Sequence, residues 1–300
     1  MKTKLQTVCA ASLAVALLLS VGATVVQAET VGYWRFEGTG YLEDSGPYNL
    51  DVTPYIGGTG PSQYTLPATG PGSDFPDPVP QNGYVNDYGV GPLTNTHDGY
   101  TGADNSVLHF TEGFTIECFF HRDDSYSSHR TVYRQFGINN MNERSVMFTI
   151  CKGDSLYRNS LEIRFSTDGS DWPFVRSYDV DTNLVYKNDK DYYGAVSVDL
   201  VNQTLTFYLK NLTDGGELLS ATTACPVSSL HDSSDNFYLG VYHSSSTYSS
   251  DPDYLDEIRV SNVALGEADL LINPVPEPST LALLGCGLIG LLAYAWRKRK

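Results

Sequence analysis

The sequence is poor in positive charge. Its 300 residues include 19 Lys and Arg against 35 Asp and Glu, which gives a formal net charge of −16 at pH 7. Proteins that bind nucleic acid or anionic membranes do so through clustered Lys and Arg, and a field of the opposite sign repels those partners. The composition therefore predicts no nucleic-acid partner and favours cations and solubility.

Cysteine is scarce and shows no metal-binding pattern. Cys9 and Cys286 lie in the two apolar ends of the chain, which leaves Cys118, Cys151 and Cys225 between them. None belongs to a Cys-x-x-Cys pair or a Cys/His cluster, so a zinc site is not indicated. One disulfide and one free thiol would suit an oxidising compartment, but the spacing does not choose among the three pairings.

The central region lacks sustained helical periodicity, and apolar residues instead alternate in short runs separated by turn residues. Such runs are typical of an antiparallel sandwich or barrel, so the sequence predicts an all-β fold. Asp168-Gly169 and Asp214-Gly215 predict hairpins, because these dipeptides supply the positive φ of tight turns. The alternating runs are 114–120, 146–150, 161–165, 195–200 and 204–209.

The first 28 residues have the organisation of a secretory signal peptide. Lys2 and Lys4 form a short basic region, an apolar stretch surrounds residues 13–19, and Val-Gln-Ala precedes Glu29. This pattern predicts export and cleavage after Ala28. A retained N-terminal membrane helix is the alternative.

The C-terminus ends in an apolar run followed by basic residues. Residues 281–296 carry no charge, and as a helix they would be about 24 Å long, slightly short for a hydrocarbon core of about 30 Å. The basic residues 297–300 would remain cytoplasmic and leave the preceding domain outside. The sequence predicts one C-terminal transmembrane helix, either a temporary tether or a lasting anchor.

A specific motif precedes that helix. Val275, Pro276, Glu277, Pro278 and Ser279, followed by the apolar run and the basic cluster, resemble the PEP-CTERM sorting signal of Gram-negative bacteria. The resemblance covers residues 274–300 and implies recognition by an exosortase-type membrane protease. It also implies an inner-membrane-tethered precursor that is then transferred to the cell surface or released outside.

Between the two ends, residues 29–273 are expected to form one domain. Pro and Gly are concentrated at 54–92, and a long stretch of that composition inside a compact domain is usually a functional or disordered loop. We therefore expect an insertion there, between the first strand and the body of the sandwich.

Several landmarks of this domain resemble the laminin-G-like jelly roll of the concanavalin A-like lectin/glucanase superfamily. That resemblance implies two facing antiparallel sheets and, in most members, binding or scaffolding of glycans or proteins. Phe119 departs from the family, which commonly has Trp at that position. The landmarks are VGYWRFE at 31–37 with DSG at 44–46, FTIE at 114–117, VSVD at 196–199 with LTFY at 205–208, FYLG at 237–240 and YLDEIRVSNVAL at 254–265.

The acidic pattern of the catalytic relatives is missing. Glucanases of the superfamily commonly carry Glu-x-Asp-x-x-Glu on one strand, which places two carboxylates close enough for acid and nucleophile. Here Glu117 shares its strand face with Phe119 and His121, so that face is expected to lack a second carboxylate. The sequence predicts a protein that is not an enzyme, with a polysaccharide hydrolase as the alternative.

A structural Ca²⁺ ion is the one cofactor that the resemblance suggests. In related jelly rolls it lies where the first and last strands meet, near an Asp like Asp256, and Glu37 and Asp44 would add oxygens. Strand parity puts Asp256 on the face of Ile258 and Val260, pointing inward. The alternative is an Asp that caps main-chain amides at a strand end.

Aromatic residues supply a candidate ligand surface. Trp172, Tyr242 and Tyr248 would offer flat faces on which sugar rings stack. The segment 166–172 also resembles one Asp-box of sialidase-like propellers, but it occurs once, and we interpret it as a turn whose Asp bonds its own backbone.

Together these features predict an exported bacterial surface or matrix protein with a non-catalytic binding or structural jelly roll. Its expected partners are the exosortase-type protease and an extracellular polysaccharide or a surface protein.

Overall fold

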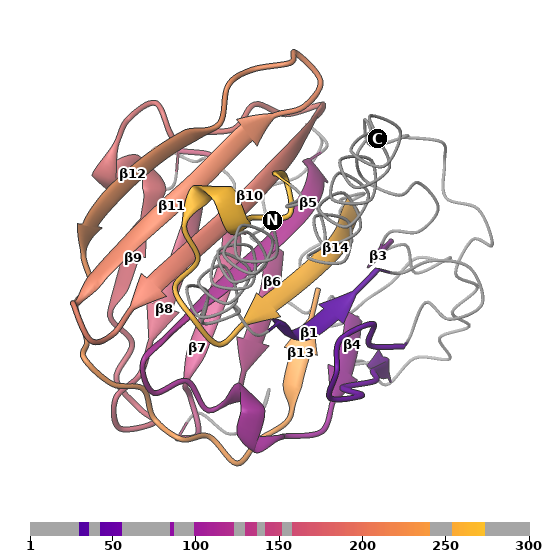
Figure 1. Ribbon diagram of the computed structural model, residues 1–300, viewed down its shortest axis with the longest axis vertical. Coiled ribbons are helices and arrows are strands. Elements are labelled where there is room, and N and C mark those ends of the chain that lie inside the picture. Colours follow the sequence, from indigo (N-terminus) through magenta and orange to yellow (C-terminus); the bar gives the residue numbers. More distant parts are fainter. Residues whose placement is uncertain are drawn as a thin grey trace, which may run out of the picture.

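The computed structural model describes two antiparallel sheets, and the predicted all-β fold is confirmed (Figure 1). Within the residues described below, one short helix, α2 (Ser177–Val180), and two 3-10 turns, η2 (Ser106–Leu108) and η3 (Glu267–Asp269), accompany the strands. The residues that the structure describes are 30–35, 43–55, 85–86, 99–122, 130–136, 142–151, 158–240 and 254–273.

The first sheet runs in the order β1-β14-β5-β10-β11-β12, with β3 paired to β14. All of its pairings are antiparallel. Its strands are β1 (Thr30–Trp34), β3 (Val85–Asn86), β5 (Gly113–Arg122), β10 (Lys190–Asp199), β11 (Thr204–Asn211), β12 (Leu219–Ala224) and β14 (Tyr254–Ser261).

The second sheet runs in the order β2-β4-β13-β6-β7-β8-β9 and is also antiparallel throughout. Each predicted alternating run lies on a strand, apart from Leu200, which follows β10 directly. The strands are β2 (Thr53–Tyr55), β4 (Gly99–Gly102), β6 (Arg130–Gln135), β7 (Val146–Cys151), β8 (Ser160–Phe165), β9 (Phe174–Arg176) and β13 (Phe237–Leu239).

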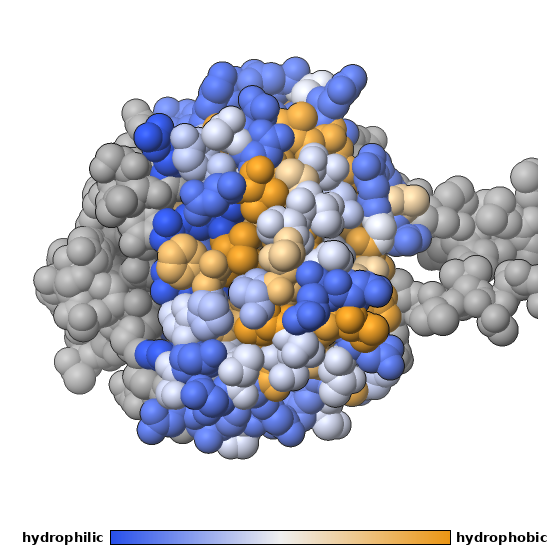
Figure 2. Space-filling model, turned by 90° about the vertical axis from the view of Figure 1, so that its left-hand side faces the viewer, coloured by the Kyte–Doolittle hydropathy of each residue, from blue (hydrophilic) through white to orange (hydrophobic). Residues whose placement is uncertain are grey.

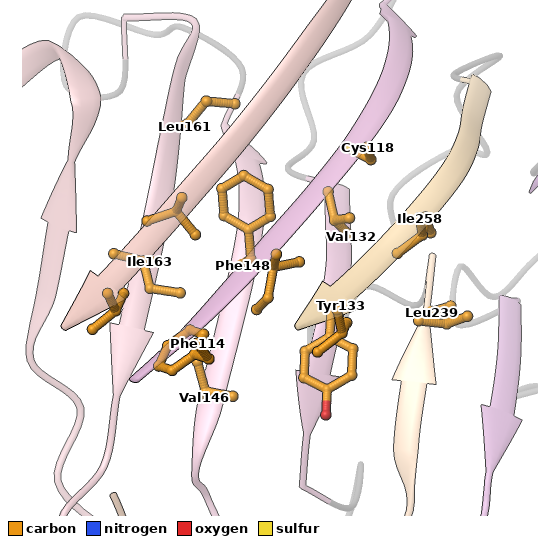
Figure 3. Close-up of a cluster of buried hydrophobic side chains, with 14 of the residues drawn as sticks. Phe114, Cys118, Val132, Tyr133, Val146, Phe148, Leu161, Ile163, Leu239 and Ile258 are labelled. Atoms are coloured by element: carbon orange, nitrogen blue, oxygen red, sulfur yellow. The ribbon is translucent and has the colours of Figure 1, made fainter. Parts of the chain in front are cut away.

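The main core lies between the sheets. Phe114 from the first sheet and Phe148 and Ile163 from the second are fully buried in one apolar cluster (Figure 3). Trp34 joins the layers, since its ring lies 5.2 Å from that of Phe237 and its Nε1 donates to the carbonyl of Leu50 at 2.8 Å. This packing is the arrangement of a β-sandwich.

A second apolar cluster lies on the outer face of the first sheet. The segment after β14 crosses in front of β5 and β10 (Figure 1), and its residues Leu265, Leu270 and Ile272 pack on Phe119 and Tyr193. Because both faces of β10 are covered, seven of its successive residues are buried instead of alternating with exposed ones. We call residues 263–273 the strap.

Both predicted hairpins are confirmed. Gly169 has φ +86° in the connection between β8 and β9, and Gly215 has φ +68° between β11 and β12. At Gly169 a side chain is also excluded by space, because a Cβ there would overlap the carbonyl of Asn142.

Several predictions for the ends and the insertion fall outside the described residues. These are the signal peptide with Ala28, the helix 281–296 and most of 54–92. Within 54–92, the end of β2 pairs with β4, and β3 pairs with β14, so the insertion contributes strands to both sheets. In the portion of the chain that is described, no helix combines the length and hydropathy needed to span a membrane.

The thiols of the domain do not form disulfides. Cys118 and Cys225 are buried free thiols, and every pairing of the three central cysteines would need one of them. Burial raises the pKa of both thiols. Since the thiolate is the reactive form, iodoacetamide at pH 8 should leave both unlabelled in the native protein and label both in urea, as mass spectrometry would detect. Labelling of Cys118 at equal rates in the two conditions would contradict this burial.

Candidate functional site

The acid of the FTIE motif is a buried structural group. Glu117 is 0 % exposed on β5, and its Oε1 accepts from Nε of Arg259 at 2.6 Å and lies 2.5 Å from the NH2 nitrogen of that residue. Its Oε2 accepts from the hydroxyl of Tyr193 at 2.6 Å and from the main-chain N–H of Leu271 at 2.8 Å. Burial, together with this carboxylate, raises the pKa of Tyr193 well above its usual value. Glu117 thus joins three strands and the strap.

The face of Glu117 carries further carboxylates, contrary to the expectation from its own strand. Arg259 and Glu117 are register partners, and the neighbouring β14 brings Asp256 and Glu257 to the same side. Glu257 is buried, accepts from the hydroxyl of Tyr33, and lies 3.6 Å from Nε of Arg35. Strand parity within β5 could not reveal these residues, because they belong to β14, which lies beside β5 only in the folded sheet.

The predicted inward direction of Asp256 is wrong, although its burial at 2 % exposure is as expected. Asp256 pairs with Phe119 of the outer cluster, while Leu255 and Ile258 both belong to the main core. The register shifts between Asp256 and Arg259, and Glu257 has φ +51°. A β-bulge of this kind inserts an extra residue and reverses the parity of everything before it.

Asp44 behaves as the cap that was the alternative to a calcium ligand. Its Oδ1 accepts from the main-chain N–H of Tyr33 and of Gly46, each at 2.7 Å, and its Oδ2 accepts from that of Leu50 at 2.9 Å. These three donors hold the turn after β1 against the next segment. They also take three of the roughly four lone-pair sites that the carboxylate could offer a cation.

Asp44 is therefore an unfavourable ligand for the predicted Ca²⁺ ion. In the described ranges no three His, Cys, Asp or Glu side chains are grouped so that they would hold a metal ion. Glu37 lies outside those ranges, so the calcium site stays a prediction that this arrangement of Asp44 and Asp256 does not favour.

Trp172 is half-buried at the end of the β8–β9 connection. Its ring is nearly perpendicular to that of Phe136 at a centroid distance of 5.1 Å, and the guanidinium of Arg144 lies 5.2 Å from its centroid. Tyr242 and Tyr248, the other predicted members of this surface, lie outside the described residues. The structure thus places Trp172 beside one aromatic ring and one arginine and leaves the three-residue platform a prediction.

The turn before Trp172 is held by the carboxylates of two aspartates. Asp168 Oδ1 accepts from the main-chain N–H of Ser170 at 2.7 Å and of Asp171 at 2.8 Å. Asp171 in turn accepts from the hydroxyl of Ser166 at 2.6 Å and the N–H of Thr167 at 2.8 Å. The interpretation of this segment as a self-bonded turn is confirmed.

This turn should make stability depend on pH. The N–H groups of Asp171 and Ser170 hold the pKa of the Asp168 carboxyl well below its ordinary value of 3.8. A carboxyl with a lower pKa in the folded state stabilises the protein above the unfolded pKa and loses that contribution as pH falls through the folded one. Asp168→Asn should therefore destabilise the protein at pH 7 and progressively less below about pH 4. Urea unfolding of the wild type and Asp168→Asn at pH 7 and below about pH 4 measures the loss of stability. A loss of equal size under both conditions would contradict the prediction.

The sequence did not single out a second aromatic group, on β8 and β9. Phe174 is 45 % exposed, and the guanidinium groups of Arg176 and Arg164 lie 4.3 Å and 5.4 Å from its ring centroid. Both arginines bond the buried Glu162, with Nε of Arg164 at 2.5 Å from Oε1 and Nε of Arg176 at 2.7 Å from Oε2. The alternation of Trp172, Phe174 and Arg176 was a visible signal, but exposure cannot be read from it.

One histidine of the domain bridges two carboxylates. Nε2 of His109 lies 3.1 Å from Asp104 Oδ1, and its Nδ1 lies 2.6 Å from Asp232 Oδ1. Gln135 donates to the same Asp104 oxygen at 3.4 Å. All these side chains are at least partly accessible except Gln135, so this group is the described constellation that most resembles an acid–base pair.

With this geometry established, comparison with known proteins identifies the tail. Residues 274–300 match the model of the PEP-CTERM protein-sorting motif. The chain carries a PEP-CTERM sorting signal. That signal marks an exported protein that an exosortase-type protease processes at the membrane, destined for the cell surface or the exterior. The matched segment begins at the residue after Asn273, the last one that the structure describes.

The domain resembles known β-sandwich structures in fold alone. The botulinum neurotoxin serotype D binding domain has 11% identity and a TM-score of 0.50, covering 82% of this chain and 50% of its own. The serotype C1 binding domain has 12% identity and a TM-score of 0.49, with 82% and 51% covered. A Trypanosoma rangeli sialidase in complex with sialic acid has 12% identity and a TM-score of 0.45, with 83% and 33% covered.

This chain spans about half the length of the two toxin domains. No curated protein matches it in sequence. The laminin-G-like relationship therefore stays a prediction.

Proposed function

We propose that the exported domain is a non-catalytic laminin-G-like jelly roll that binds or scaffolds extracellular polysaccharide outside the cell. The observation that carries this proposal is the state of Glu117. The acid of the strand on which catalytic relatives would place theirs is fully buried, and both its oxygens accept hydrogen bonds from Arg259, Tyr193 and the strap. A general acid or nucleophile has to reach its substrate, so this carboxylate supports a structural role.

The sorting signal supports the place of action. A protein processed by an exosortase-type protease acts at the surface or outside, which is where it would meet an extracellular polysaccharide. The aromatic residues that the domain exposes, Phe174 and the half-buried Trp172, support binding over a purely inert role. Aromatic side chains with one exposed face are common anchors at binding surfaces.

The test is a thermal-shift and hydrolysis assay on the full chain in detergent micelles. We expect a rise in Tm with at least one polysaccharide from a panel of acidic and neutral polymers, and no release of reducing ends. Calcium and a chelator would be compared in the same assay, and a calcium-dependent rise in Tm would support the predicted Ca²⁺ site. No shift with any polymer would overturn the binding proposal.

The hydrolase alternative rests on His109 with Asp104 and Asp232. Two carboxyls about 5–10 Å apart in a cleft would suit glycoside hydrolysis. Release of reducing ends that disappears in Asp232→Asn and persists in Glu217→Gln, an exposed control, would favour the hydrolase over the binding protein.

A further inference from the structure

Strand β9 forms one edge of the second sheet, and Phe174 stands at its start. Figure 1 shows β9 at the same side of the molecule as β12, and Figure 2 views that side, where apolar residues lie among hydrophilic ones. Phe174 is one of three large apolar side chains that are exposed within the described residues; the others are Val201 and Leu219. A single exposed apolar residue needs no explanation, but the surroundings of Phe174 are specific.

Two guanidinium groups frame the Phe174 ring, and one buried acid orients both. Glu162 has 2 % side-chain exposure and gives one oxygen to each of Arg164 and Arg176. A carboxylate that bonds two arginines fixes their planes before a ligand arrives, so less conformational freedom is lost when the ligand binds than at flexible surface side chains. The result is an exposed ring with pre-oriented cations beside it.

Arg164 keeps binding capacity in this arrangement. A guanidinium has five N–H donors, and the bond to Glu162 uses the Nε–H. The Arg164 side chain is 25 % exposed. Its terminal nitrogens can therefore meet a ligand at the edge of the Phe174 ring.

A second ring and guanidinium lie just before this one. The N–H of Phe165 donates to the carbonyl of Pro173 at 2.9 Å, so the extended pairing of β8 and β9 continues toward Trp172 and its partner Arg144. Residues two apart in an extended chain lie about 7 Å from each other on one side of it. Trp172 and Phe174 thus form a short track of two rings, each with an arginine. Of the acids near the track, Glu162 bonds Arg164 and Arg176. Asp168 and Asp171 direct their carboxylates to N–H and O–H groups of their own turn.

We propose that this track binds an acidic polysaccharide whose sugar rings carry carboxylates, a polyuronate. The ring of Phe174 would take the apolar face of a sugar, and the fork of Arg164 would take its carboxylate, the pairing that planar bidentate recognition favours. A chain of net charge −16 repels a polyanion. Acidic sugar therefore needs local cations, and the track supplies Arg144, Arg164 and Arg176, with Glu162 as an acid that bonds two of them. This inference rests on the proposed binding function and names its ligand class and site.

The test measures surface plasmon resonance of the full chain in detergent micelles on immobilised polygalacturonate. The methyl ester of the same polymer serves as the second channel, because it keeps the sugar and removes the charge. Phe174→Ala and Arg164→Gln are the test variants. Leu219→Ala, an equally exposed apolar residue at 44 %, and Lys210→Gln are their matched controls, and far-UV circular dichroism checks that all fold alike.

We expect the wild type to prefer polygalacturonate over the ester. Phe174→Ala should weaken binding about tenfold on both polymers, and Arg164→Gln should weaken it about tenfold on the acid alone, losses typical of one anchor group. The controls should stay within about twofold. If the wild type binds polygalacturonate and the test variants match their controls, this site is wrong and the binding function stands. Equal binding of acid and ester overturns the acidic ligand class, and binding to no polysaccharide in this assay or the panel overturns both proposals.

Discussion

Replacing Trp34 with alanine is expected to lower the free energy of unfolding by about 3–5 kcal/mol, the range for removing a large buried aromatic side chain. Trp34 is 0 % exposed, and its ring links the two sheets through Phe237. The neighbouring Gly32 makes room for it, because a Cβ at Gly32 would overlap the indole. Urea unfolding followed by far-UV circular dichroism measures the change without relying on the fluorescence that the mutation removes.

Trp34→Phe separates the two contributions of this residue. It keeps an aromatic ring between the sheets but leaves the carbonyl of Leu50 without the donor that reaches it at 2.8 Å. A loss of about 1–3 kcal/mol is expected for that change. Val201→Ala, at a position 70 % exposed, is the control and should stay within about 0.5 kcal/mol. A loss below about 1 kcal/mol in Trp34→Ala would mean that the sheets do not depend on this ring.

The buried pair of Glu117 and Arg259 carries the second large effect. Glu117→Leu would leave the guanidinium of Arg259, with 16 % side-chain exposure, without its carboxylate. It would also leave the hydroxyl of Tyr193 and the N–H of Leu271 without their acceptor. Breaking one side of a buried pair costs about 3–5 kcal/mol, and urea unfolding should show a loss of that size.

The double variant Glu117→Leu with Arg259→Met tests the cause. Removing both charges abolishes the uncompensated cation, so the double variant should recover part of the loss, with an interaction energy of about 1–3 kcal/mol in the cycle. Amide hydrogen exchange in the strap should be faster in Glu117→Leu, because the N–H of Leu271 loses its bond to the first sheet. Strictly additive single losses would show that the two side chains act independently.

The secondary structure was predictable where local signals decide it. The run 161–165 alternates, Asp168-Gly169 follows it, and the structure forms β8, a turn with Gly169 at φ +86° and β9. These are properties of neighbouring residues, namely side-chain period and the positive φ that glycine tolerates. The same reasoning predicts the burial of β10 less well. There the strap covers the outer face, so buried and exposed residues no longer alternate.

The candidate site was predictable only in part, because its geometry depends on pairing between distant segments. Parity along β14 placed Asp256 inward, and one bulged residue, Glu257, reversed it. The role of Glu117 depends on Arg259 and Leu271, 142 and 154 residues further along the chain. Exposure likewise separates Phe174 from the buried phenylalanines of the core, although nothing local distinguishes them.

The sequence alone determined the destination of this protein and its strand content. Both depend on neighbouring residues, because the sorting signal at 274–300 is a linear motif and strands follow a period of two. Only the tertiary structure decided which acids are structural, which residues of β14 point into the main core, and which rings reach solvent. Those properties depend on contacts between residues far apart in the chain, which a linear pattern does not encode.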